Sequence, residues 1–161
     1  MQLIFVDTEE ANPTPTGWAL REFGAVDFES RRTFHGQDSS RQTFEAFKTW
    51  LESLGPERKV FVSDNPAYDW APIHFHFHLY FGENPFGHSA RRIGDFYAGL
   101  VGDFGRSSEW KRLRITKHDH HPVNDAMGNV EAFARMLAGE RVEPARERPC
   151  AHCPSPELHG D

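Results

Sequence analysis

Two carboxylates near the start of the chain have the spacing of a divalent-cation site. Asp7 and Glu9 follow the apolar stretch 2–6, with Thr8 between them. If that stretch is a strand, its period of two places both carboxylates on one face and Thr8 on the other. Carboxylates so close repel each other unless a cation joins them, and hard divalent ions prefer oxygen ligands. The same spacing is also typical of a solvated turn, so the pair alone does not establish a site.

Two further carboxylates occur where helices are predicted to begin. Asp69 comes just ahead of a helix whose start is indicated by Pro72, and Asp125 opens the last apolar helix. Either residue could instead be a helix cap, a role that stabilises a protein by about 1 kcal/mol. Asp64 directly follows a short apolar strand and is a competing candidate ligand. His120 lies five positions before Asp125, on the connecting loop.

The elements that must position these residues are predicted from apolar spacing and turn signals. Strands are predicted over residues 2–6, 18–28, 31–34, 59–62 and 91–94, and helices over 41–54, 71–81, from Asp95 and over 125–137. The segment 11–17 is dense in turn-forming residues and is predicted to be a loop. Three early strands followed by strand–helix alternation indicate a mixed sheet of five or six strands with helices on both faces, an α/β fold.

Length and composition indicate one domain without a membrane span. The chain has 161 residues, and its mean hydropathy is −0.65, with no apolar run near the roughly 18 residues that a span needs. Its two cysteines fall in the last dozen residues, so a reducing cytoplasm is the expected location. Residues 140–161 are rich in Pro, Glu, Arg and His. We therefore predict a domain over residues 1–139 and a disordered or loosely attached tail over 140–161.

The charge is unevenly distributed along the chain. The net charge is −6 at pH 7, which is not typical of a general nucleic-acid-binding protein. Residues 106–117, however, include five Lys or Arg residues opposed only by Glu109. Such a run is either a solvated surface or a strip that contacts phosphates beside the acidic site.

Taken together, these pieces resemble the DEDDh branch of the DnaQ-like 3′–5′ exonucleases, which have an RNase H-like fold. The matches are Asp7-Thr8-Glu9 with residues 22–26 on the next strand, Asn65 with Asp69, and His120 with Asp125. The stretch 120–129 looks most like a small bacterial and phage exoribonuclease subgroup. Many relatives have Thr-Thr-Gly or Cys-Thr-Gly after the first motif, where this chain has Glu10-Ala11-Asn12. The backbone that holds the terminal nucleotide is therefore expected to differ.

The resemblance implies a metal-dependent 3′–5′ exoribonuclease that releases nucleoside 5′-monophosphates from single-stranded RNA or short oligonucleotides, with RNA preferred over DNA. It implies two Mg²⁺ or Mn²⁺ ions on four carboxylates, those of Asp7, Glu9, Asp69 and Asp125. His120 would take the proton from the attacking water. The expected substrate-binding residues are Thr8, Glu10, Asn65, Arg112 and Arg114. No membrane partner is expected, and because related exonucleases often dimerise, a homodimer is a further expectation.

Two other readings of the sequence remain open. The chain could be a catalytically inactive RNase H-like module that binds nucleic acid or protein, although such a module has no need of four converging carboxylates. It could also be a histidine-rich metal-binding protein, because His74, His76 and His78 alternate. On a strand these three would share a face, whereas on the favoured helix only His74 and His78 align. Cys150 and Cys153 could bind zinc, but a reduced tail is the simpler interpretation.

Overall fold

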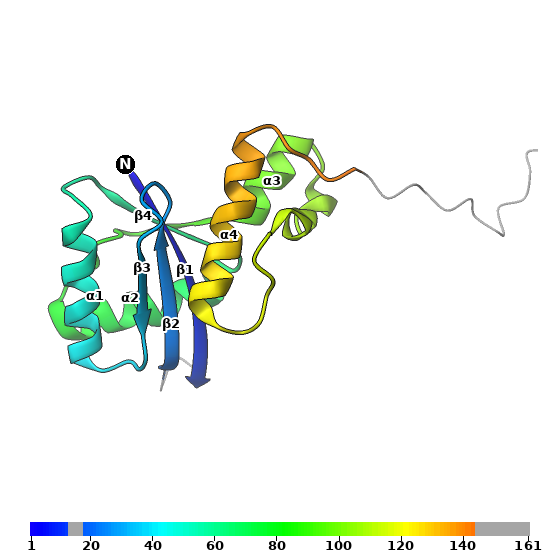
Figure 1. The fold of residues 1–161 in the computed structure, drawn as a ribbon. Coiled ribbons are helices and arrows are strands. Elements are labelled where there is room, and N and C mark those ends of the chain that lie inside the picture. Colours follow the sequence, from blue (N-terminus) through cyan, green and yellow to red (C-terminus); the bar gives the residue numbers. More distant parts are fainter. Residues whose placement is uncertain (13–17, 144–161) are drawn as a thin grey trace, which may run out of the picture.

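A central sheet of five strands separates two layers of helices. The structure is a computed structural model that describes residues 1–12 and 18–143. In Figure 1, helices α1 and α2 lie on one side of the sheet, and α3 and α4 lie on the other. This arrangement confirms the predicted α/β class and the mixed sheet, and it is consistent with an RNase H-like fold.

The sheet contains both parallel and antiparallel pairs. Its strands are β1 (Gln2–Asn12), β2 (Ala19–Asp27), β3 (Thr33–Gly36), β4 (Lys59–Ser63) and β5 (Ala90–Arg92). They are arranged in the order β3-β2-β1-β4-β5. The pairs β1–β2 and β2–β3 are antiparallel, whereas β1–β4 and β4–β5 are parallel. The carboxyl ends of β1 and β4 therefore meet at one end of the sheet, where Asp7 and the start of the next helix lie.

The first strand is longer than predicted. It was expected to end at residue 6, and residues 11–17 were expected to form a loop, but Ala11 and Asn12 belong to β1. The strand extends because β2 supplies partners between Ile4 and Asn12, with Asp7 opposite Gly24 and Glu9 opposite Glu22. The register shifts after Glu9, which fits a bulge rather than an early turn. Residues 13–17 lie outside the described part of the chain.

Within the described residues, four α-helices and two 3₁₀-helices, η1 and η2, cover the sheet. They are α1 (Arg41–Ser53), α2 (Pro66–Phe81), α3 (Ile93–Val101), η1 (Phe104–Arg106), η2 (Glu109–Leu113) and α4 (Pro122–Leu137). The amphipathic helix α1 matches its prediction and begins at an N-cap, where the Ser40 hydroxyl accepts a bond from the Thr43 amide. The starts predicted for α2 and α4 were wrong, because Pro66 and Pro122 open these helices.

Alternation along β1 divides the apolar core between the two faces of the sheet. Phe5 belongs to the cluster under α3 and α4, and its neighbours Ile4 and Val6 belong to the cluster under α1 and α2. The second cluster is aromatic, with buried Phe23, Phe44, Phe47, Phe61, Phe77 and Phe86. By the same alternation, Asp7 lies on the α4 side and Thr8 on the α2 side.

Helix α4 rests directly on β2 at Gly24. A Cβ atom at this position would lie 2.3 Å from the carbonyl carbon of Pro122 and 2.4 Å from the amide nitrogen of Val123. Only glycine permits so close an approach, because both contacted atoms belong to the backbone. The contact fixes the first turn of α4, and Asp125 with it, over the β1–β2 pair.

We expect Gly24→Ala to lower the free energy of unfolding by about 1–3 kcal/mol, because the added methyl group must displace the α4 backbone. Thermal and urea denaturation measure this change. The matched control is Gly99→Ala within α3, where nothing lies within 4 Å of the new Cβ and where alanine favours the helix. Equal stabilities for the two variants would show that the contact at Gly24 is not close enough to constrain α4.

The described chain continues past α4 and remains packed. Val142 is buried, its amide donates a 3.0 Å hydrogen bond to the Tyr97 hydroxyl, and its carbonyl accepts one from Arg106. Residues 140–143 therefore pack on the domain, whereas the sequence indicated a tail from residue 140. The cysteines Cys150 and Cys153 lie outside the described residues. No helix within residues 1–12 and 18–143 is long and apolar enough to cross a membrane.

Candidate active site

Three carboxylates from the first strand and the last helix converge. Asp7 and Glu9 project from β1 toward α4, and Asp125 in the first turn of α4 meets them. One oxygen of each carboxylate lies within 4.8 Å of an oxygen of the other two. Asp125 is not the residue that caps this helix, because the N-cap position is His121. The cluster could hold a divalent cation, and its ligand atoms are all oxygen.

The fourth predicted carboxylate, Asp69, comes from the opposite layer. It lies in the first turn of α2, and its Oδ1 accepts hydrogen bonds from the Thr8 amide at 3.1 Å and the Thr8 hydroxyl at 3.0 Å. The alternative role of Asp69 as a helix cap is excluded, because Asn65 occupies the N-cap position of α2. Thr8 therefore links α2 to β1 and holds Asp69 beside the cluster.

The electrostatics of this cluster favour a bound cation. Burial, together with the nearby Asp69, Asp125 and Glu9 carboxylates, raises the pKa of the Asp7 carboxyl to about 8, while the Arg114 guanidinium opposes the shift. Burial also raises the pKa of the Asp69 carboxyl to about 7, against the hydrogen bonds from Thr8. Concentrated negative charge therefore destabilises the ionised site, and a divalent cation would relieve that repulsion.

Two histidines of the loop before α4 lie over the carboxylates. His120, predicted as the general base, has its Nδ1 3.6 Å from Glu9 Oε1, and its side chain is 75% exposed. His118 Nδ1 lies 2.6 Å from Asp125 Oδ2, and the two imidazole rings are in contact with a centroid distance of 4.3 Å. The backbone of His120 has φ of 62°, which is uncommon outside glycine. The sequence assigned no role to His118, because nothing in its spacing distinguishes it from its neighbours.

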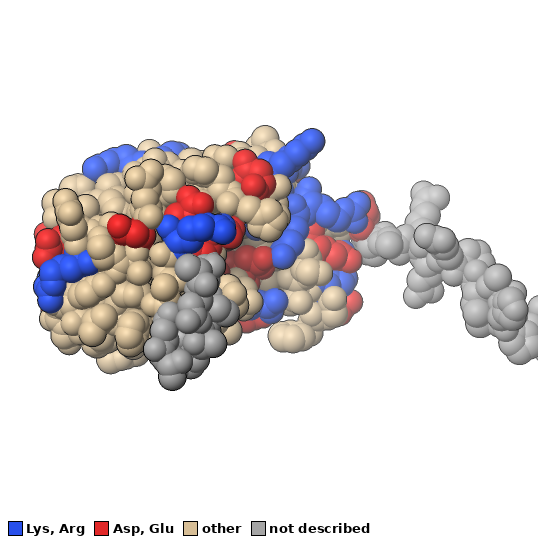
Figure 2. Space-filling view, turned by 90° about the horizontal axis from the view of Figure 1, so that it is seen from below, with Lys and Arg blue, Asp and Glu red and all other residues tan. Residues whose placement is uncertain are grey.

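Asp7 opens onto a cleft with a basic wall. The cleft has a volume of about 550 Å³ and is lined by Asp7, Asp64, Lys111, Arg112, Arg114, Lys117 and His118. Figure 2 looks onto this end of the molecule and shows acidic side chains in a hollow, with Lys and Arg side chains on both sides. The later part of the basic run 106–117, from Lys111 onward, therefore forms a strip beside the acidic site. Arg106 instead pairs with Glu109.

Arg114 is the most firmly held of the basic side chains that form this wall. Its guanidinium donates a hydrogen bond to the Asn129 side chain on α4 and lies 5.0 Å from the centre of the Trp110 ring. Both partners are fully buried, so the Arg114 guanidinium is held in a fixed position beside Asp7. Arg112 is exposed and lines the cleft without such support. Lys111 and Lys117, which belong to the basic run identified in the sequence, complete the wall.

The remaining predicted residues occupy the margin of the site. Asn65 is exposed at the N-cap of α2, and its carbonyl accepts bonds from the Tyr68 and Asp69 amides. Glu10 pairs with Leu20 in the sheet, and its side chain lies outside the described structure. Asp64, the competing ligand candidate, faces the cleft but forms a 2.5 Å ion pair with Lys111. It is not part of the three-carboxylate cluster.

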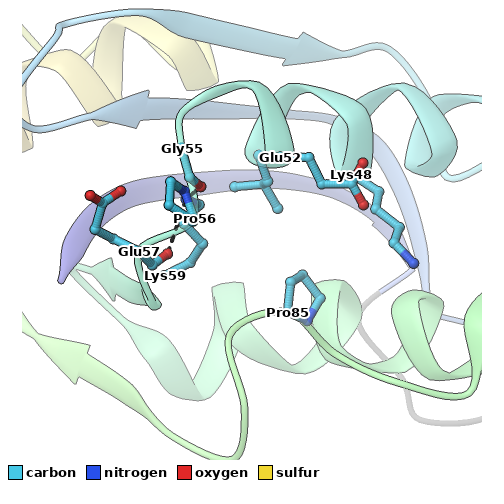
Figure 3. A pocket seen from close by; sticks show the side chains of 8 residues that line it. Lys48, Glu52, Gly55, Pro56, Glu57, Lys59 and Pro85 are labelled. Atoms are coloured by element: carbon cyan, nitrogen blue, oxygen red, sulfur yellow. Dashed lines mark hydrogen bonds between the residues drawn. The ribbon is translucent and has the colours of Figure 1, made fainter.

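A second hollow, also of about 550 Å³, lies at the other end of the sheet, between α1 and the loop after α2 (Figure 3). Its buried ammonium, that of Lys59, donates to Gln2 and to the carbonyls of Gly55 and Glu57. All three donors of this ammonium are satisfied, so Lys59 has a structural role at this end of the sheet. The histidine series lies on α2 as predicted, with the rings of His74 and His78 in contact at 4.5 Å.

Comparison with known proteins gives one partial match. No family model matches the chain. A protein of Escherichia coli named 3′-5′ DNA exonuclease Cap18 is 37% identical over 94 residues, which is 54% of this chain. The chain spans about half the length of that relative, because the match covers 50% of it.

Proposed function

We propose that this protein is a metal-dependent 3′–5′ exonuclease of the DnaQ-like DEDDh type. The observation that carries the proposal is the convergence of Asp7, Glu9 and Asp125 within 4.8 Å, with Asp69 held beside them by Thr8. Four carboxylates from three separated segments have no structural need to meet, and their meeting raises the pKa of Asp7. Similarity to a protein named as a 3′-5′ DNA exonuclease supports the same function.

The four carboxylates fit divalent ions such as Mg²⁺ or Mn²⁺, because the donors are all oxygen and their mutual repulsion calls for positive charge. When bound, such ions would supply an activated water and stabilise the charge on the departing 3′ oxygen. Thr8 keeps Asp69 oriented beside the other three carboxylates through two hydrogen bonds to Oδ1.

The loop before α4 supplies the proton acceptor. His120 is exposed at the rim and near Glu9, so its imidazole can reach a water above the carboxylates. His118 is held by Asp125 and so orients the loop rather than receiving the proton. The basic side chains that line the cleft provide contacts for the phosphates of the nucleic acid; they are Lys111, Arg112, Arg114 and Lys117.

The proposed substrate is the 3′ end of a single-stranded nucleic acid. The resemblance of residues 120–129 to exoribonucleases favours RNA, whereas the name of the relative favours DNA. We therefore propose both RNA and DNA as substrates. Discrimination between them would require a contact with the 2′-hydroxyl of the ribose.

The test is digestion of a 5′-labelled single-stranded RNA and its DNA twin with Mg²⁺, Mn²⁺ or EDTA, resolved on a sequencing gel. We expect a ladder that shortens from the 3′ end and is absent with EDTA and with Asp125→Ala. If both nucleic acids are shortened, the ratio of the two rates gives the preference for RNA or DNA. Intact substrate in every lane, with retained binding in a gel-shift assay, would favour the inactive binding module instead.

The two loop histidines are expected to differ in effect. His120→Ala should lower the single-turnover rate by about 10²–10⁴-fold while the Mg²⁺ concentration for half-maximal rate changes little, because general-base catalysis contributes that much. His118→Ala should have a smaller effect on the rate at saturating Mg²⁺, since His118 contacts Asp125 and the neighbouring ring. If His118→Ala is the variant that loses the rate, the two roles must be exchanged.

A further inference from the structure

A second group of metal-ligating side chains lies next to the carboxylates and shares none of them. It consists of Glu22 on β2, His35 on β3 and His121 at the N-cap of α4. One donor atom of each lies within 4.8 Å of the other two. His35 Nε2 is 2.8 Å from Glu22 Oε2, and the rings of His35 and His121 have a centroid distance of 4.9 Å. We propose that these three side chains bind a borderline transition-metal ion, Zn²⁺ or a similar one.

The sheet register explains why the three donors meet. Gly24 pairs with His35 across β2 and β3, and paired residues project from the same face. Glu22 precedes Gly24 by two positions and so projects from that face as well. The missing side chain at Gly24 lets the Pro122 backbone rest on β2, which brings the adjacent His121 over the other two donors. The group is therefore built by three elements of the fold rather than by one flexible segment.

The donor chemistry separates this site from the carboxylate cluster. Two imidazoles and one carboxylate are a typical zinc ligand set, whereas Mg²⁺ prefers oxygen donors alone. Ligand atoms on one tetrahedral zinc ion are about 3.3 Å apart, since each bond is about 2.0–2.1 Å long. The present donors can reach that spacing by small side-chain rotations. His121 is exposed, so the fourth position can be taken by water.

Binding would replace the hydrogen bond between His35 and Glu22 and release any proton shared there. It would also tie residue 121 to β2 and β3. The adjacent loop carries His118 and His120, so the ion would restrain the segment that covers the acidic cluster. The inference does not depend on nuclease activity, because it concerns binding by residues outside that cluster.

The test is titration of the full chain with Zn²⁺ in competition with a chromogenic chelator, in excess Mg²⁺ so that the carboxylate cluster is occupied. Cys150→Ser and Cys153→Ser are introduced together to remove the thiols. We expect one equivalent to bind, and we expect His35→Ala and His121→Ala each to weaken it by at least about 10-fold. Co²⁺ should give ligand-field bands without a sulfur charge-transfer band, even in the chain that retains both cysteines.

The matched control is His78→Ala, which removes a histidine that also contacts another histidine ring but lies on α2. Zinc affinity should be unchanged in that variant. Circular dichroism checks that each variant is folded. Because His121 is exposed, His121→Ala should fold normally and keeps the test valid even if His35→Ala unfolds. The proposal is overturned if Zn²⁺ does not bind, if affinity is equal in wild type and His121→Ala, or if only His78→Ala weakens it.

Discussion

Asp7→Asn is expected to lower kcat/KM for nucleotide release by at least about 10³-fold, equivalent to about 4 kcal/mol of transition-state stabilisation. Asn keeps the size of the side chain and removes its charge. Asp7 is the carboxylate whose pKa responds to Asp69, Asp125 and Glu9 together, so it lies nearest the centre of the cluster. Single-turnover release of the 3′-terminal nucleotide at saturating Mg²⁺ measures the effect.

The matched control is Asp95→Asn, which removes the same charge from the exposed first turn of α3, where Asp95 pairs with Arg92 at 2.9 Å. That variant should retain the wild-type rate. If Asp7→Asn is as active as Asp95→Asn, the proposed site is wrong even if some nuclease activity is found.

The same substitution is expected to stabilise the protein when metal is absent. The Asp7 pKa is about 8 in the folded chain against an ordinary 3.8, so between these values the folded state holds the proton more tightly than the unfolded state. The free energy of unfolding therefore falls as the pH rises from about 4 to about 8. In EDTA at pH 8, Asp7→Asn should raise Tm by about 4–8 °C, which is about 2 kcal/mol for a domain of this size.

The difference in Tm between wild type and Asp7→Asn is measured at several pH values, so that other titrating groups cancel. It should be small at pH 4 and largest at pH 8. Mg²⁺ should then raise the Tm of wild type more than that of the variant, because the ion binds the folded state. A difference that is constant with pH would contradict the buried, mutually repelling carboxylates.

Local sequence patterns predicted the class of the fold and that the two early carboxylates share one face of the sheet. The period of two along β1 placed Asp7 and Glu9 together and Thr8 opposite, and the structure confirms both. What the pattern could not predict is the partner of Thr8, because Asp69 reaches it from another layer. The pairing of His118 with Asp125 was also hidden, since the loop between them has no periodicity.

The helix starts show a second limit of sequence patterns. Both α2 and α4 begin with proline at the first position, where its missing amide costs nothing. Pro72 was taken as that signal in α2, but it lies inside the helix, where proline normally breaks the hydrogen-bond pattern. The helix begins at Pro66 instead, which places Asp69 in the first turn, where it contacts Thr8.

The carboxylate cluster joins the first strand of the chain to its last helix, and this has a consequence during synthesis. Ribosomes add about 5–20 residues per second, so α4 emerges several seconds after β1. Until α4 docks at Gly24, the nascent chain lacks Asp125 and the loop histidines and cannot complete the cluster. If the proposed nuclease accepts RNA, the message being translated is safe from the unfinished enzyme, because hydrolysis must wait for release of the whole domain.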